Sequence, residues 1–217
     1  MLALIFTLAL DQRVAAAPPD GTYAYAETSN GRPAGTTSVV IKRNAGVVTA
    51  TEFGKLSAMG QSIRAETALA LDVSLAPTSY KATYTVGPRV IHAAIAFSNG
   101  TASETSDNGN TSYGLTGGAK SFAILDGGFM AGTMFVPAQM LARENLPMIG
   151  LIPSFGLGIP LAPDAAMKPD RPATVPAGDA SLTFGGHAVI SIWYDPKTLV
   201  VDEVDVPSQN ATVIRQP

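Results

Sequence analysis

Residues 62–71 read SIRAETALAL, and the alternation in this stretch decides the fold. The residues at every second position, Ile63, Ala65, Thr67, Leu69 and Leu71, are mostly apolar and fall on one face, and the positions between them hold Ser62, Arg64, Glu66 and two alanines. Side chains of a strand point alternately to its two faces, so a period of two indicates a strand with one face buried. The stretch therefore predicts a half-buried strand.

The same period extends outward from this stretch, from Gly21 to about Leu115. Turn signals interrupt it at short intervals, among them Asn30-Gly31, Asn99-Gly100 and Asn108-Gly109. Asn-Gly between alternating segments is typical of a two-residue β-hairpin. About eight strands at this spacing predict an antiparallel meander in which each strand pairs with the one before it.

The pattern changes beyond this meander. A short apolar strand is expected over residues 121–125, and Asp126 then stands where a side chain would cap a helix. Residues 129–145 predict a broken helix, with Pro137 in the first turn of its second piece. Residues 146–178 contain seven prolines among apolar residues. We expect this stretch to form a long connection that lies against an apolar surface.

Alternation resumes at Ala180, and strands are expected over residues 181–184, 187–194, 199–206 and 211–215. The predicted fold class is mainly β. It is a curved antiparallel meander or half-barrel with one short helical segment and one long proline-rich loop. Residues 18–217 are expected to form a single β domain, which is an ordinary size for a chain of this class.

Composition excludes several functions. The 217-residue chain has a net charge of −3 and no cysteine, so disulfides, thiolate metal sites and cysteine nucleophiles are ruled out. No basic patch stands out along the sequence, and we therefore expect no nucleic-acid partner. No cofactor is expected either.

The first ten residues, MLALIFTLAL, form an apolar run that is too short to span a bilayer. The run has the length of the apolar region of a signal peptide, and small residues follow it at Ala15, Ala16 and Ala17. No Lys or Arg precedes the run, which departs from the usual pattern. Residues 1–17 are predicted to be a signal peptide, cut after Ala16 or Ala17. The mature protein is then periplasmic or extracellular, with no stable transmembrane segment.

Histidine chemistry has little support in the sequence. His92 and His187 each lie within a predicted strand, and neither has another His, Asp or Glu at ligand spacing along that strand. A zinc site usually takes three or four ligands. Both histidines are therefore interpreted as packing or surface residues, and no metal site is predicted.

The most specific enzymatic hypothesis depends on Asp126. The segment Ala123-Ile124-Leu125-Asp126-Gly127-Gly128 is similar to the catalytic loop of retropepsin-type aspartic peptidases, which act as dimers. Those enzymes place Thr or Ser after the aspartate, where this chain has Gly127. A helix cap after the strand is the favoured explanation of Asp126. No enzymatic activity is expected, and a peptidase stays a remote alternative.

The C-terminal third carries a resemblance to a family. The run from Ile192 to Leu199, IWYDPKTL, and the run from Val204 to Gln209, VDVPSQ, resemble exported bacterial proteins of the DUF3108-like group, a family of unknown function. The resemblance spans most of residues 21–215, although the insert between Pro153 and Pro176 has no counterpart. It implies a curved half-barrel sheet and supplies no catalytic residues.

A curved sheet has a concave face that must be filled by side chains, a helix or a ligand. One hypothesis is a periplasmic carrier that holds an apolar, lipid-like molecule there; the residues proposed to contact it are Phe129, Met140, Phe155, Leu157 and Trp193. The alternative is a structural or interaction module of the cell envelope, without a ligand. The expected partner is accordingly an apolar small molecule or an envelope protein.

Overall fold

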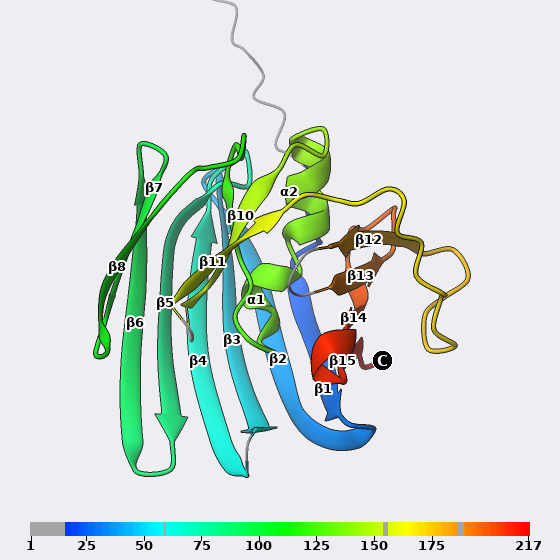
Figure 1. Ribbon diagram of the computed structural model, residues 1–217, viewed down its shortest axis with the longest axis horizontal. Helices are drawn as coiled ribbons and strands as arrows, with labels where there is room; N and C mark the ends of the chain where they lie inside the picture. Colours follow the sequence, from blue (N-terminus) through cyan, green and yellow to red (C-terminus); the bar gives the residue numbers. More distant parts are fainter. Residues whose placement is uncertain (1–15, 59, 154–155, 186–188) are drawn as a thin grey trace, which may run out of the picture.

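The computed structural model describes residues 16–217 except 59, 154–155 and 186–188. The proposed signal peptide before residue 16, Phe155 and His187 lie outside the described residues. The described part of the chain contains two sheets, two short α-helices and a short 3-10 helix, joined by loops (Figure 1). The mainly β class predicted from the sequence is confirmed.

The larger sheet has twelve strands, and its first eight follow one another in space as they do in sequence. All eight pair antiparallel with their neighbours, which confirms the predicted meander. These strands are β1 (Gly21–Ser29), β2 (Arg32–Asn44), β3 (Val47–Ala58), β4 (Gln61–Leu71), β5 (Pro77–Val86), β6 (Arg89–Ser98), β7 (Thr101–Ser106) and β8 (Gly109–Gly114).

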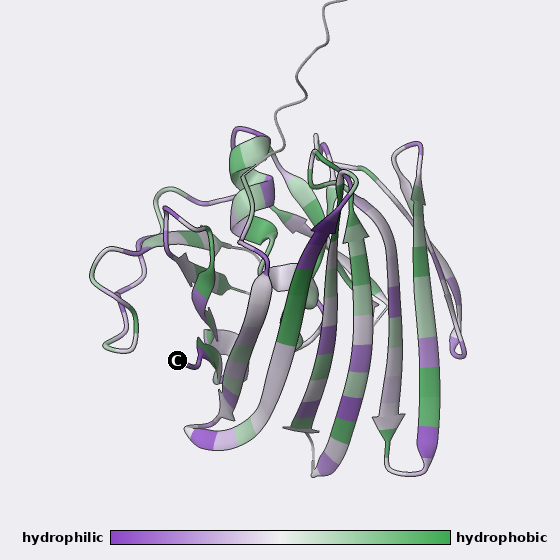
Figure 2. Cartoon of the chain, turned by 180° about the vertical axis from the view of Figure 1, so that it is seen from behind, coloured by the Kyte–Doolittle hydropathy of each residue, from purple (hydrophilic) through white to green (hydrophobic). Residues whose placement is uncertain are grey.

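Hairpin turns fix the register of this meander. Asn30 and Gly31 both have positive φ, at 51° and 69°, and Asn99 and Gly100 repeat the pattern at 48° and 73°. Positive φ at both central residues matches the turn to the twist of the paired strands. The alternation of the sequence then places one set of side chains inside. Polar and apolar residues follow one another along these strands (Figure 2).

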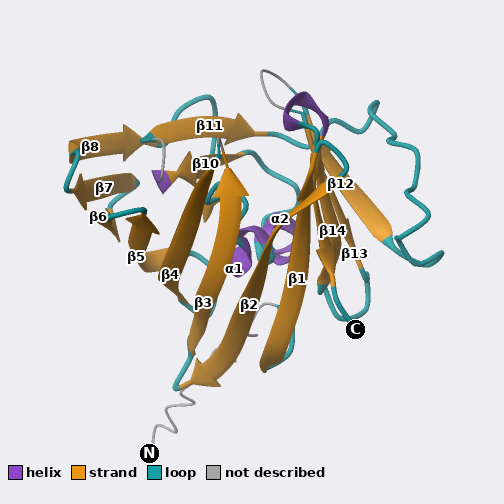
Figure 3. Ribbon diagram, turned by 90° about the horizontal axis from the view of Figure 1, so that it is seen from below, coloured by secondary structure: helices purple, strands orange, loops and turns teal. Residues whose placement is uncertain are grey.

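Four C-terminal strands extend the same sheet past its first strand. They are β12 (Ala180–Phe184), β13 (Ile190–Tyr194), β14 (Val201–Val206) and β15 (Ala211–Arg215), and a short 3-10 helix, η2 (Pro207–Gln209), joins the last two. Strand β15 pairs antiparallel with β1, so the last strand of the described residues lies beside the first. The sheet is strongly curved and does not close, which agrees with the predicted half-barrel (Figure 3).

The second sheet corrects one expectation. Residues 146–178 were expected to be an irregular connection, yet they contain β10 (Met148–Ile152) and β11 (Leu157–Leu161). Strand β10 pairs parallel with β9 (Phe122–Ile124) and antiparallel with β11. Pro160 is tolerated because β11 is an edge strand of this sheet, where a missing N–H breaks no ladder.

The broken helix predicted over residues 129–145 is confirmed as α1 (Met130–Thr133) and α2 (Val136–Ala142). Pro137 lies in the first turn of α2, as expected. Both helices lie inside the curve of the large sheet, with β10 and β11 crossing its upper part (Figures 1 and 3). None of the described helices is long and apolar enough to cross a membrane.

Candidate functional site

Residues 126–142, which we call the plug, occupy the concave face of the large sheet. Contacts of α1 with β2, β3 and β4 place it over the centre of that face. The largest apolar side chains of the plug are almost completely buried, with exposed fractions between 0% and 4%: Phe129, Met130, Met134, Phe135 and Met140. The concave face is therefore covered by the protein's own chain.

Close packing at two glycines brings the plug down onto its neighbours. A Cβ atom on Gly54 of β3 would lie 2.7 Å from the ring of Phe129. A Cβ atom on Gly132 of α1 would lie 2.5 Å from the backbone oxygen of Ile124 in β9. Real Cβ contacts are longer, so only glycine permits these approaches.

Glu52 of β3 holds the first turn of α1. One carboxylate oxygen accepts the N–H of Met130 at 2.7 Å, and the other accepts the N–H of Ala131 at 2.9 Å. The hydroxyls of Thr37 and Thr67 also donate to this carboxylate. The first amides of a helix have no partners within it, and an acceptor from the sheet satisfies them here. Glu52 is thus the cap of α1, supplied from a distant part of the chain.

Asp126 does not cap the helix, contrary to the expectation from the sequence. No side chain at the start of α1 itself caps that helix. The Asp126 carboxylate instead accepts hydrogen bonds from the phenols of Tyr80 and Tyr84 on β5. Its exposed fraction is 2%. Burial and the nearby Asp126 charge raise the pKa of both phenols well above the usual value, so both remain donors.

Glu27 of β1 is the second carboxyl beneath the plug. Its Oε2 atom is buried and has no hydrogen-bond partner among the described residues. A Cβ atom on Gly128 would lie 2.8 Å from this oxygen, so the plug backbone presses directly on the carboxyl. Burial raises the pKa of Glu27 to about 7. Ionisation of Glu27 therefore opposes the packed arrangement.

The surface of the large sheet beneath the plug, which we call its seat, carries several carboxyl groups. Glu27 and Glu52 contact the plug from the sheet, and Asp126 belongs to the plug itself. Glu104 of β7 is buried, accepts a hydrogen bond from Tyr113, and lies near enough for the charge of Asp126 to raise its pKa. Burial is the largest cause that raises the pKa of each of the three glutamates, to about 7 for Glu52. The ion pairs found among the described residues, Arg43–Asp20 and Arg215–Asp202, involve none of these four carboxyl groups. The described residues also contain no group of three or more His, Asp or Glu side chains placed to hold a metal ion.

We predict that stability depends on pH through Glu27. A pKa raised by folding gives stability that is complete below the unfolded value and is lost as the pH rises through the folded value. At about pH 8, Glu27→Gln should therefore raise the free energy of unfolding by roughly 1 kcal/mol, after allowance for partial solvent screening. At about pH 5 the variant should match the wild type. Urea denaturation at both pH values measures this, with Glu66→Gln on the exposed face of β4 as the control; equal effects of the two variants would refute the assignment.

The five residues proposed from the sequence to contact a ligand do not line one cavity. Phe129 and Met140 belong to the buried plug, and Phe129 packs against Tyr84 with ring centroids 6.2 Å apart. Leu157 is 52% exposed, on the edge strand β11. Trp193 is buried but stands outside the main core cluster. Phe155 lies outside the described residues.

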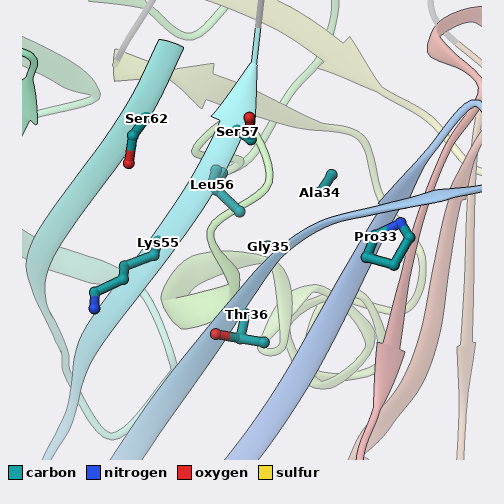
Figure 4. A pocket seen from close by; sticks show the side chains of 8 residues that line it. All are labelled: Pro33, Ala34, Gly35, Thr36, Lys55, Leu56, Ser57 and Ser62. Atoms are coloured by element: carbon teal, nitrogen blue, oxygen red, sulfur yellow. The ribbon is translucent and has the colours of Figure 1, made fainter. Parts of the chain in front are cut away.

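Two open hollows of about 320 Å³ each are found on the large sheet. Both include Thr36 and Lys55, whose side chains project from the outer face of β2 and β3; one of the hollows is drawn in Figure 4. The second also includes Phe53, which is 48% exposed. Each hollow also includes buried residues of the sheet, Leu56 in the first and Tyr25 and Thr37 in the second.

Glu52 and Glu27 were not identified from the sequence as site residues. A signal was present, because Glu52 stands at a buried position in the alternation of β3, between Ala50 and Gly54. A charged residue at an inward position requires a buried partner. The partner lies on a helix far along the chain, and the local pattern does not reveal it.

Comparisons with known proteins add no relative. A scan against family models, a search of curated proteins and a search of solved structures each find no match. The resemblance to the DUF3108-like group therefore stays an expectation from the sequence. The functional argument rests on the geometry of the plug and its seat.

Proposed function

We propose that this protein is an exported module of the cell envelope that serves a structural or interaction role, with its concave face filled by its own chain. The observation that carries the proposal is the burial of the plug, whose Met134, Phe135 and Met140 side chains have no exposed surface. Ligand sites of carriers are concave and largely preformed. Here the corresponding space is packed with side chains.

The open edge of the sheet supports an interaction role. Strand β8 ends the sheet on one side, and five of its six residues are exposed. Exposed edge strands present unpaired N–H and C=O groups to other chains. Polar residues dominate this strand, which keeps such an edge soluble while leaving its backbone accessible.

A carrier of apolar molecules is the second candidate, and the acidic seat of the plug favours it. A permanent core seldom buries a carboxyl without a partner, yet Glu27 has an unpaired buried oxygen beneath Gly128. Ionisation of Glu27 places a charge beneath the plug and weakens the packing of the plug on the sheet. This change favours displacement of the plug. Once the plug is displaced, the sheet would offer an apolar groove lined in part by the carboxyl groups of the seat.

Native mass spectrometry of the mature protein, purified from its host's envelope, separates the two candidates. A module with a filled face should appear at the mass of the bare chain. A co-purifying apolar molecule, retained in a second preparation and lost on denaturation, would reject the module and favour the carrier. A peptidase would need two copies in contact at Asp126, and the burial of that side chain gives this alternative no support.

Export has its own test. We expect the mature protein to begin at Ala17 or Pro18, and N-terminal sequencing of the envelope fraction determines this. Arg43 of β2 donates hydrogen bonds to the backbone oxygen of Ala17, at 3.1 Å, and to that of Pro18. These bonds hold the expected start of the mature chain against β2. A chain that retains residues 1–16 after fractionation would refute the processing.

A further inference from the structure

The two sheets end in the strands β8, β9, β11 and β12, and three of these edges are protected. Pro163 bridges the free side of β12, where the N–H of Asp164 also donates to the oxygen of Thr183 at 2.9 Å. Strand β11 carries Pro160, and all three residues of β9 are buried. Proline, charge, bulges and covering segments keep an edge from pairing with another chain. Strand β8, GNTSYG, has no proline, no charge and no shift in its register with β7.

The backbone of β8 bonds alternately to β7 and to the open edge. The N–H of Leu115 donates to the oxygen of Gly100 at 3.2 Å, just beyond the last residue pair of the two strands. Hydrogen-bonded and non-hydrogen-bonded pairs alternate along an antiparallel ladder, so Tyr113 and Thr111 also bond to β7. The residues between them turn their N–H and C=O groups to the open edge: Asn110, Ser112 and Gly114.

Nothing in the described part of the chain covers this edge. Besides the pairing of β8 with β7, no backbone hydrogen bond reaches Asn110, Ser112 or Gly114 from another described residue. Strand β8 lies at the margin of the molecule in two perpendicular views, with no other described strand beyond it (Figures 1 and 3). A further strand can therefore be added beside β8.

The sequence of β8 is complementary to itself when two copies run antiparallel about Ser112. Asn110 of one copy then lies opposite Gly114 of the other, and the two Ser112 residues face each other. Each of these pairs can exchange both N–H···O bonds. On the concave side, Thr111 lies opposite Tyr113 of the second copy, and a β-branched residue beside an aromatic ring is a favourable cross-strand pair. The two-fold axis repeats every one of these contacts.

No like charges meet in this arrangement. The residues of β7 and β8 on the convex face are uncharged, and Glu104 on the concave face accepts a hydrogen bond from Tyr113 of its own copy at 2.8 Å. Asp107, in the turn before β8, accepts the N–H of His92 at 2.8 Å. Antiparallel pairing places the two Asp107 carboxylates at opposite ends of the junction, roughly 30 Å apart. Charge repulsion therefore does not oppose the pairing.

We propose that β8 is a dimerisation edge, at which two copies of this chain pair antiparallel about Ser112 and join their large sheets. The inference rests on the proposed interaction role and names its partner as a second copy. An extended segment of another protein could use the same edge, but the self-complementary sequence of β8 favours the second copy. The contact is smaller than the roughly 800 Å² per partner of a stable interface, so the dissociation constant should lie at about 10–500 μM.

Sedimentation velocity of the mature protein, from about 10 μM to about 1 mM, tests the proposal. Ser112→Pro removes the N–H at the centre of the junction in both copies and should raise the dissociation constant at least about tenfold. An edge strand tolerates proline where its N–H faces solvent, so the fold should be kept. Ser112→Ala is the matched control, because it leaves the backbone donor in place and should stay within about twofold of the wild type.

Cross-linking tests the register, since the chain has no cysteine of its own. In the proposed dimer the two Ser112 Cα atoms are about 5.5 Å apart, within the range of a disulfide. The two Ser103 Cα atoms, one strand further out on each side, are roughly 15 Å apart. Mild oxidation should therefore link Ser112→Cys at least about tenfold faster than Ser103→Cys.

A wild type that stays monomeric up to about 1 mM overturns the proposal and leaves the edge to an extended segment of another protein. Equal dissociation constants for Ser112→Pro and Ser112→Ala overturn it too, because the copies would then meet elsewhere. If circular dichroism shows that Ser112→Pro does not fold, the two cysteine variants decide, and equal linking rates reject the dimer. These results do not affect the filled concave face, which is rejected only by a co-purifying apolar molecule on the monomer or the dimer.

Discussion

Glu52→Ala is expected to lower the free energy of unfolding by roughly 3–5 kcal/mol, because it leaves several buried donors without an acceptor. The N–H groups of Met130 and Ala131 and the hydroxyls of Thr37 and Thr67 all converge on this one carboxylate. No side chain next to α1 can replace it, since no local residue caps this helix. Chemical denaturation followed by circular dichroism measures the change.

Two further variants make this prediction specific. Glu52→Gln keeps one acceptor oxygen and loses the other, so its effect should be intermediate, about 1–3 kcal/mol. Glu66→Ala removes a carboxylate from the exposed face of the neighbouring strand β4 and should cost less than about 0.5 kcal/mol. A loss below about 1 kcal/mol for Glu52→Ala would show that Glu52 does not hold the plug.

Local patterns predicted the meander and its turns because the forces that shape them act between near neighbours. The alternation in residues 62–71 decides which face of β4 is buried, and Asn30-Gly31 adopts the positive φ values that its hairpin needs. Each hairpin then brings the next strand beside the last. The pairing of β15 with β1 was not predicted, because it joins the two ends of the chain and no local signal specifies it.

The site escaped prediction for the same physical reason. Glu52 and the amide of Met130 are 78 residues apart in sequence, so neither local pattern contains the other. Asp126 shows how a local rule fails: its position after a strand suits a helix cap, but the phenols of Tyr80 and Tyr84 bind it instead. Likewise, β10 forms within a proline-rich stretch because β9 offers it a partner. Tertiary contacts decided all three outcomes.

Phe135→Ala is expected to produce the second large loss, about 3–5 kcal/mol of the free energy of unfolding. The Phe135 side chain has no exposed surface and is among the largest fully buried groups of the described residues. It lies where α1 meets α2, and its backbone joins both helices, donating to Gly132 at 3.0 Å and accepting from Gln139 at 2.8 Å. Truncation therefore removes apolar contacts and leaves a cavity inside the plug.

Leu141→Ala is the matched control, because Leu141 lies on α2 with 49% of its surface exposed and should cost less than about 1 kcal/mol. The comparison also bears on function. If the plug is a permanent part of the core, Phe135→Ala should lower stability and create an apolar cavity that binds a small probe such as benzene, which the wild type excludes. If the plug is a displaceable cover, the loss should be small and apolar probes should bind the wild type and the variant alike. Urea denaturation with and without benzene distinguishes these results, since a bound probe raises the free energy of unfolding of the form that binds it.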